Sequence, residues 1–308
     1  MPSLLERLPS GSRIAVIRLR SLGDCVLTTP ALALLKAHRP DARVAVLVED
    51  RFRAVFEGNP DIDDILGPRA GELRRWRARL VLNLHGGTRS MFLGLASGAA
   101  IRAGFGHHRH SWLYSARIPQ AQEILGEDRP VHTAEHIASA MFWMGVPRAT
   151  IPRAKLGVAM SGDAARMSAC ATLAALHPFA SEPAKTWPAE RFVELANYLR
   201  ANGLEPVFVA GPNDDVSAFQ SFRVLRGAPL AEVKSLIAGA QIFIGNDSGP
   251  AHIAAAFGVP VVALFGASNP GTWAPWRTEA RVLTSPYGIN AIETAEAIAA
   301  LESLKVRA

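Results

Sequence analysis

The sequence predicts an α/β protein made of two doubly wound domains, each with a parallel sheet covered by helices on both faces. Short apolar strands alternate with helical patterns along the chain, and this alternation favours a parallel sheet. The first two predicted strands begin about thirty residues apart, the length of a βαβ unit. The alternation restarts after an irregular segment, so we predict domains 1–160 and 161–308.

The first domain begins with RIAVIRL, residues 13–19, an apolar run with few polar interruptions that predicts a buried strand. A helix should follow, with Thr28 and Thr29 before Pro30 and apolar residues at helical spacing beyond it. Further strands are predicted at 43–48, 80–84 and 100–105.

The second domain repeats the pattern. A helix over 189–200 is expected to begin at Pro188 and to end at Gly203, because proline is favoured at helix starts and glycine just past their ends. Strands are expected at 172–176, 206–210, 241–245, 260–265 and 281–284. Further helices are expected at 230–238, 250–257 and 291–304.

Composition narrows the class of protein. A chain of 308 residues with 49% hydrophobic and 19% charged residues is typical of globular proteins and excludes disordered, collagen-like and coiled-coil chains. Its two cysteines, Cys25 and Cys170, are too few for a disulfide framework or a Cys-rich zinc cluster. Three arginines interrupt the first apolar run, so we expect no secretory signal. The longest apolar stretch, 253–265, is too short to span a bilayer, and we expect a cytoplasmic protein.

Charge is divided unevenly between the two predicted domains. Residues 1–160 hold 22 Lys and Arg against 14 Asp and Glu, a net charge of +8, whereas residues 161–308 hold 11 against 13, a net charge of −2. The basic half suggests an anionic partner: a phosphorylated lipid headgroup, an acidic sugar or nucleic acid. A solvated arginine-rich surface is the competing interpretation. Because no zinc-finger or aromatic RNA-binding pattern accompanies the charge, we expect no nucleic-acid partner.

The residues that directly follow the strands are the candidate site, because ligands of open α/β sheets bind beyond the carboxyl ends of the strands. The first strand runs into RLRSLGD, residues 18–24, which lacks the glycine fingerprint of dinucleotide-binding enzymes. Asp24 is either the N-cap of the next helix or a carboxylate that faces the ligand as a general base.

Two later loops carry candidates for binding a phosphate. After the 172–176 strand, Ser181 and Lys185 precede a helix, where a hydroxyl and an ammonium group suit an anion; a solvated loop lysine is the alternative. After the 241–245 strand, small and polar residues lead into a helix whose first amides can face a ligand, or which is simply capped around a packed histidine. The candidates in this second loop are Asp247, Ser248, Gly249 and His252.

Other side chains are weaker candidates. Asp214 and Asp215 follow the 206–210 strand, where a carboxylate accepts bonds from ribose hydroxyls or caps a helix. The histidines of the 107–110 loop lie among glycine and arginine, with no cysteine or carboxylate nearby, so a surface loop is favoured over a metal site. The chain has no Walker loop, Gly-x-Ser-x-Gly elbow or His-Glu-x-x-His, and we expect no metal or other cofactor.

Taken together, these loops resemble the ADP-heptose:lipopolysaccharide heptosyltransferases of glycosyltransferase family 9 over nearly the whole chain. The matching blocks are RIAVIRLRSLGDCVLTTPAL, LVLNLHGGTRS, HPFASEPAKTWPAERFVELANYL and IFIGNDSGPAHIAAAFGVPVVALFGASNP. The resemblance implies the GT-B architecture, in which two Rossmann-like domains face each other across a cleft. It also implies an inverting, metal-independent transfer of a heptose from ADP-heptose to a lipopolysaccharide inner-core acceptor.

The resemblance also implies roles for single residues. Asp24 would be the base that deprotonates the acceptor hydroxyl, and Lys185 would support the departing ADP. The donor nucleotide-sugar would be held by residues of the C-terminal domain: Ser181, Lys185, Asp215, Asp247, Ser248, Gly249 and His252. The anionic acceptor would lie against the N-terminal domain, with contacts expected from Arg18, Arg20 and Arg89. An acceptor made at the inner membrane suggests peripheral association with that membrane.

Three other classes of protein remain alternatives to this function. The first is another GT-B enzyme that uses a UDP- or GDP-sugar, a transferase or a 2-epimerase. The second is a non-catalytic two-domain α/β binding protein. A nicotinamide dehydrogenase is disfavoured because its glycine fingerprint is absent from the sequence.

Overall fold

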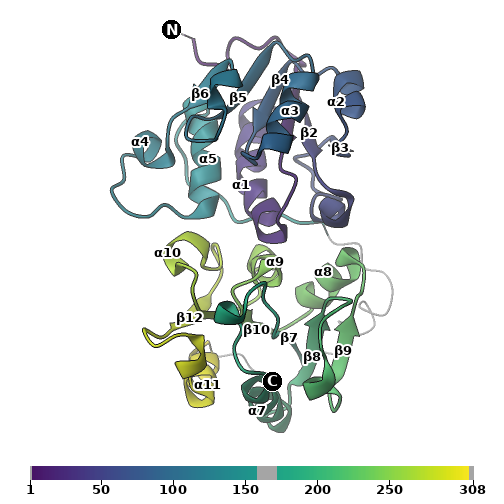
Figure 1. Ribbon diagram of the computed structural model, residues 1–308, viewed down its shortest axis with the longest axis vertical. Helices are drawn as coiled ribbons and strands as arrows, with labels where there is room; N and C mark the ends of the chain where they lie inside the picture. Colours follow the sequence, from purple (N-terminus) through teal and green to yellow (C-terminus); the bar gives the residue numbers. More distant parts are fainter. Residues whose placement is uncertain (1, 158–171, 305–308) are drawn as a thin grey trace. The chain divides into compact units, whose positions relative to one another are not determined.

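The computed structural model describes residues 2–157 and 172–304. The chain divides into two compact units, Met1–Gly157 and Val158–Ala308, which we call unit 1 and unit 2. Each unit holds one six-stranded parallel sheet with helices packed on it (Figure 1), which confirms the predicted fold class. The predicted boundary between residues 160 and 161 lies outside the described residues, as does Cys170.

The sheet of unit 1 has the strand order β3-β2-β1-β4-β5-β6. Its strands are β1 (Arg13–Ile17), β2 (Arg43–Leu47), β3 (Asp64–Leu66), β4 (Leu80–Asn83), β5 (Ile101–Phe105) and β6 (Ala116–Ile118). The four predicted strands are confirmed. Strands β3 and β6 were not predicted, because three-residue edge strands carry neither a long apolar run nor a clear alternation.

Five α-helices accompany this sheet. They are α1 (Leu22–His38), α2 (Ala70–Trp76), α3 (Thr88–Ala96), α4 (Ala121–Leu125) and α5 (Thr133–Met144). Helices α1 and α5 pack against each other. The predicted helix after β1 is confirmed, but it starts well before Thr28, so Pro30 lies in its interior rather than near its start.

A single hydroxyl group makes Pro30 tolerable inside α1. Proline has no N–H to donate to the carbonyl four residues earlier, which here belongs to Val26. The Thr29 hydroxyl donates to that carbonyl oxygen at 2.9 Å and accepts a bond from the Lys155 backbone N–H at 2.9 Å. Since Thr29 is completely buried, the bond to Val26 forms away from solvent and the helix continues without an unsatisfied carbonyl.

The sheet of unit 2 has the order β12-β11-β10-β7-β8-β9. Its strands are β7 (Leu173–His177), β8 (Glu205–Ala210), β9 (Arg223–Arg226), β10 (Ile242–Asn246), β11 (Val261–Phe265) and β12 (Ala280–Thr284). Its helices are α7 (Ala189–Ala201), α8 (Leu230–Ala238), α9 (Gly249–Phe257), α10 (Pro270–Trp273) and α11 (Thr294–Ser303). Every strand and helix predicted here is found; β9 and the short α10 were not predicted. Within the described ranges, no helix is long and apolar enough to cross a membrane.

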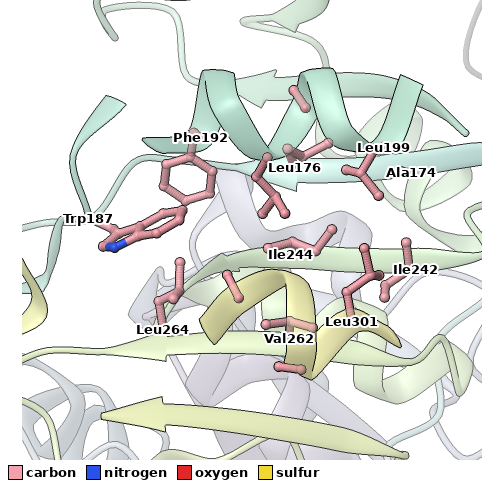
Figure 2. Packing of buried hydrophobic residues seen from close by; sticks show 14 of the residues in the cluster. Ala174, Leu176, Trp187, Phe192, Leu199, Ile242, Ile244, Val262, Leu264 and Leu301 are labelled. Atoms are coloured by element: carbon pink, nitrogen blue, oxygen red, sulfur yellow. The ribbon is translucent and has the colours of Figure 1, made fainter. Parts of the chain in front are cut away.

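The hydrophobic core of unit 2 fixes the segment that precedes α7. Trp187 is completely buried, its ring lies 5.0 Å from that of Phe192, and its indole N–H donates to the Ile292 carbonyl oxygen at 2.8 Å. Figure 2 shows both rings at one end of a cluster that includes Ile244 and Leu264. Burying each such aromatic side chain contributes about 1.5–3 kcal/mol, so this segment is firmly anchored.

In each sheet the order of the strands reverses at one point. In unit 1, β2 and β3 lie on one side of β1, and β4, β5 and β6 lie on the other. In unit 2, β8 and β9 lie on one side of β7, and β10, β11 and β12 lie on the other. Ligands of open α/β sheets bind beyond the carboxyl ends of the strands at such a point. The candidate sites are therefore the residues after β1 and β4 in unit 1 and those after β7 and β10 in unit 2.

Candidate active site

Arg18 and Asp24 meet beyond the carboxyl end of β1. Arg18 directly follows the strand, and its backbone N–H donates to the Leu47 carbonyl oxygen at 3.0 Å. Its Nη1 lies 3.4 Å from Asp24 Oδ1, with side chains that are 7% and 23% exposed, respectively. Burial lowers the pKa of Arg18, and the charge of Asp24 opposes that change. The switch point of unit 1 therefore presents a partly exposed carboxylate beside a buried guanidinium.

The N-cap of α1 is Ser21, so the interpretation of Asp24 as the N-cap is wrong by three residues. Asp24 instead bonds back to the cap: the Ser21 backbone N–H and hydroxyl donate to Asp24 Oδ2 at 3.3 and 2.9 Å. A carboxylate three positions after the cap commonly stabilises a helix start in this way. Oδ2 thus serves the helix, and Oδ1 faces the guanidinium described above.

The three arginines expected to contact the acceptor are in different environments. Arg18 is buried against Asp24, whereas Arg20 is exposed. Arg89, in the first turn of α3, has a 62% exposed side chain and forms an ion pair with Glu49 at 3.3 Å. The structure therefore brings Arg18, and not Arg89, into contact with the candidate base.

In unit 2, the loop after β7 is held in place by its backbone and by Asn246. Lys185 ends a single 3-10 turn (η3, Pro183–Lys185) and is half-buried, while Ser181 is exposed. The Asn246 side chain donates to the Pro178 carbonyl at 2.8 Å and accepts from the Trp187 N–H at 3.1 Å, so it braces both ends of the loop.

Gly266, after β11, allows a second close contact with this loop. A Cβ added to Gly266 would lie 1.9 Å from the Ala184 carbonyl oxygen, so only glycine fits at this position. The neighbouring Ala267 N–H donates to the same carbonyl at 3.3 Å. This contact fixes the backbone that carries Lys185.

Asp247 directly follows β10, within electrostatic reach of Lys185. Burial raises the pKa of the Asp247 carboxyl, and the positive charge of Lys185 acts in the opposite direction. The Asp247 backbone N–H donates to the Leu264 carbonyl at 2.9 Å, which ties the start of this loop to β11. An acidic and a basic side chain therefore act on each other electrostatically at the switch point of unit 2.

Ser248 is the N-cap of α9, but its side chain does not cap the helix. Its hydroxyl lies 3.0 Å from Nδ1 of His177, the last residue of β7. His177 is half-buried, and removal of its ring from water lowers its pKa to about 4, so the ring is neutral at physiological pH. Gly249 begins α9, and the 4% exposed His252 lies in its first turn. The α9 N-terminus, with its partial positive charge, is thus left without its own side-chain cap.

Asp214 and Asp215 bond to the backbone of the turn that follows β8. Asp214 Oδ2 accepts from the Gly211 N–H at 2.7 Å, and Asp215 Oδ1 accepts from the Ser217 N–H at 3.0 Å. The bond from Ser217 lowers the pKa of Asp215, whose side chain is exposed. The sequence left two roles open for these carboxylates, ribose binding and capping. The bonds that both make to the local backbone are of the capping kind.

Surface hollows in unit 2 border only part of this site. One of about 540 Å³ is lined by Ser181, Trp187 and Asn290, among others. A second of about 350 Å³ shares Asn290 and includes the exposed Tyr287. Neither hollow includes the residues that directly follow β10. The candidate site is therefore defined by the side chains at the point where the strand order reverses, and not by these hollows.

Two histidines that follow the central strands, His177 and His85, were not among the candidates named from the sequence. His177 and His85 come at or just after the ends of β7 and β4, and that position alone was a signal. His136, on α5, joins His107 and His108 in ring contacts that no sequence spacing indicates. Within residues 2–157 and 172–304, no group of three or more His, Cys, Asp or Glu side chains is arranged to hold a metal ion.

Comparison with known proteins gives consistent matches. The model of glycosyltransferase family 9 (heptosyltransferase) matches residues 70–298. A lipopolysaccharide heptosyltransferase 3 of Escherichia coli is 28% identical over 293 residues, covering 84% of each chain. A family 9 glycosyltransferase structure from Veillonella parvula has a TM-score of 0.84 at 24% identity, covering 96% of this chain and 97% of its own. The E. coli ADP-heptose lipopolysaccharide heptosyltransferase II has a TM-score of 0.80 at 22% identity, covering 95% and 98%. The two structures share the fold described above.

Proposed function

Because the chain belongs to glycosyltransferase family 9, the heptosyltransferase family, we propose that it transfers a heptose from ADP-heptose to an acceptor of the lipopolysaccharide inner core. Similar proteins carry the names lipopolysaccharide heptosyltransferase 3 and ADP-heptose lipopolysaccharide heptosyltransferase II. The observation that carries the proposal is that Lys185 acts electrostatically on Asp247, which directly precedes the N-cap of α9, because an ammonium group and an uncapped helix N-terminus together suit a diphosphate.

Unit 2 binds the donor in this proposal. Lys185, the α9 N-terminus and the Ser181 hydroxyl hold the diphosphate, because an ammonium group and a helix N-terminus both attract anions. The other side chains after β10 and in the first turn of α9 line the same site: Asp247, Ser248, Gly249 and His252. Asp215, beyond the adjacent strand β8, accepts bonds from the ribose hydroxyls.

Asp24 is the general base of the reaction. Its carboxylate takes the proton of the acceptor hydroxyl, whose oxygen attacks the anomeric carbon of the heptose. The bond from that carbon to the diphosphate oxygen breaks, and ADP leaves with the electron pair. Because the acceptor oxygen enters opposite the leaving group in a single displacement, the anomeric configuration inverts.

The transfer proceeds without a metal ion in this proposal. Negative charge grows on the departing diphosphate in the transition state, and preorganised positive groups stabilise it most effectively there. Lys185 and the α9 N-terminus supply that charge. Lys185 is therefore both a binding and a catalytic residue.

Unit 1 receives the acceptor. Residues 1–160 carry a net charge of +8, which favours an acidic inner-core sugar. Arg18, Arg20 and Arg89 contact its acidic groups, with Arg18 nearest the base. We place the protein in the cytoplasm, associated peripherally with the inner membrane where such acceptors are made.

A transfer assay tests this function. The protein is incubated with ADP-heptose and a deacylated inner-core acceptor, and mass spectrometry should find the acceptor heavier by one heptosyl residue. The product should have the anomeric configuration opposite to the donor by NMR, and the rate should be unchanged by EDTA or by added Fe²⁺. Transfer only from UDP- or GDP-sugars, or only with a metal, would contradict the corresponding part of the proposal.

A further inference from the structure

Four histidines gather beyond the carboxyl ends of β4 and β5 in unit 1. His107 and His108 follow β5, and their rings lie 5.5 and 5.7 Å from that of Phe105, the last residue of the strand. His136, from α5, stacks on Phe105 at 4.2 Å and lies 5.6 Å from His107. His85, after β4, lies close enough to His108 for their charges to interact. We call these four side chains the histidine cluster.

The histidine cluster lies within electrostatic reach of the Arg18–Asp24 pair. Arg18 acts electrostatically on the imidazoles of His85, His108 and His136, and Asp24 acts on the first and last of these. All of them lie near the point at which the strand order of unit 1 reverses, since they follow β1, β4 or β5 or, in the case of His136, stack on the last residue of β5. The cluster is therefore part of the region where a ligand of unit 1 is expected.

The hydrogen bonding of this region is incomplete. In the part of the chain that the structure describes, Arg18 Nε and His108 Nδ1 are buried without a hydrogen-bond partner. The ion-pair contact of the Arg18 guanidinium, to Asp24, spans a long 3.4 Å. Buried polar atoms are normally satisfied, and because Arg18 Nε can only donate, its lack of a partner points to a ligand that supplies an acceptor oxygen.

The imidazoles can also change charge when a ligand binds. Burial lowers the pKa of His108 and of His136 to about 4 and lowers that of His85, and partial desolvation lowers that of the more exposed His107, so the free cluster is neutral at pH 7. Among the described residues, the charged groups other than histidine that act on the imidazoles of His85, His108 and His136 are Arg18, Arg20 and Asp24. A bound anion would favour protonated imidazoles, since an opposite charge nearby raises the pKa of histidine.

We propose that the histidine cluster and Arg18 form a subsite for an oxyanion, a phosphate or carboxylate group of the acceptor, which is bound together with protons. This subsite rests on the proposed function, because it assigns a role to side chains around the candidate base. His107 is exposed and the other three imidazoles are half-buried, so the group enters from solvent. The oxyanion fixes the acceptor so that its hydroxyl lies against Asp24.

The test uses the full chain with ¹⁵N-labelled histidine. Sulfate serves as the probe for a phosphate group and acetate as the probe for a carboxylate, because neither changes charge between pH 6 and 7.5. Sulfate or acetate should shift the imidazole resonances of the cluster, and whichever binds more tightly identifies the group. Each proton taken up should strengthen binding by up to about tenfold per pH unit on going from pH 7.5 to 6.

Variants separate this subsite from general attraction of anions to a basic protein. H108Q and H136Q should each weaken sulfate binding at pH 6 about tenfold and reduce its pH dependence. H107Q changes the exposed ring and should have the same effect on sulfate binding, so it takes the place of H108Q and H136Q if those variants do not fold. The matched control is H38Q, since His38 lies at the far end of the 17-residue helix α1, about 25 Å from its start. Equal sulfate binding and pH dependence in the cluster variants and wild type overturns the proposal.

Failure of this subsite can be told apart from failure of the proposed function. Heptosyl transfer with no imidazole response to sulfate or acetate overturns the subsite alone. A proton-linked imidazole response without transfer from ADP-heptose supports the subsite and overturns the function. In the transfer assay, the cluster variants should raise KM for the anionic acceptor and leave the ADP affinity of unit 2 unchanged.

Discussion

Replacing Asp24 by asparagine separates its chemical role from its structural one. The amide oxygen of D24N can still accept from the Ser21 N–H, so the start of α1 should persist. The ion pair with Arg18 is lost, and because that guanidinium is only 7% exposed, leaving it unpaired should lower the free energy of unfolding by up to about 3–5 kcal/mol. A general base contributes about 10²- to 10⁴-fold to the rate, so kcat should fall by that factor, about 2.7–5.5 kcal/mol.

Three measurements on D24N decide whether Asp24 acts as the general base. Initial rates of heptosyl transfer give kcat, calorimetry gives the affinity for ADP, and urea unfolding gives the stability. The affinity for ADP should match that of wild type, because its proposed contacts all lie in unit 2. The matched control is S21A, which removes the 2.9 Å hydroxyl bond to Asp24 but keeps the carboxylate, and should lose less than about tenfold in kcat. If D24N keeps kcat within tenfold of wild type, Asp24 serves only to begin the helix.

Three further predictions concern other parts of the chain. K185A should weaken ADP binding by about 1.5–3 kcal/mol, the value of a charge-assisted bond, and lower kcat; calorimetry and rates that match wild type would reject this role. G266A should destabilise unit 2 by about 1–3 kcal/mol in urea unfolding, because its Cβ would lie 1.9 Å from a carbonyl oxygen of the η3 loop. Burial raises the pKa of the Cys25 thiol to about 12, so at pH 8 iodoacetamide should label it, in a C170S background, only as fast as the protein unfolds; rapid labelling of the folded chain would contradict this.

The sequence was sufficient to predict the central strands and the general place of the site. Buried strands of a parallel sheet are continuous apolar runs, so RIAVI and VVALF were recognisable without a structure. Because ligands bind beyond the carboxyl ends of such strands, the loops that carry Lys185 and Ser248 followed from them. Edge strands such as β9, which is half-exposed, lack that signature and were missed.

Contacts between distant residues explain what the sequence could not predict. Whether Asp24 or Ser21 caps α1 depends on where the first turn closes, and Pro30 obscured that start. The partnership of His177 with Ser248 joins residues 71 positions apart and arises only because β7 and β10 are neighbours in the sheet. In the same way, His136 reaches the 107–108 loop through the packing of α5, which no local pattern encodes.

The hydroxyl of Thr29 also bears on how unit 1 could be engineered. Threonine and valine have nearly the same shape, yet T29V would strip both the Val26 carbonyl and the Lys155 N–H of their partner, whereas serine would keep both. Replacing Pro30 by alanine would give the Val26 carbonyl its ordinary backbone N–H donor. Because the Thr29 hydroxyl already bonds to that carbonyl, this replacement should stabilise α1 less than removal of an interior proline usually does. A library built to thermostabilise unit 1 should therefore vary positions 29 and 30 jointly, because neither can be scored on its own.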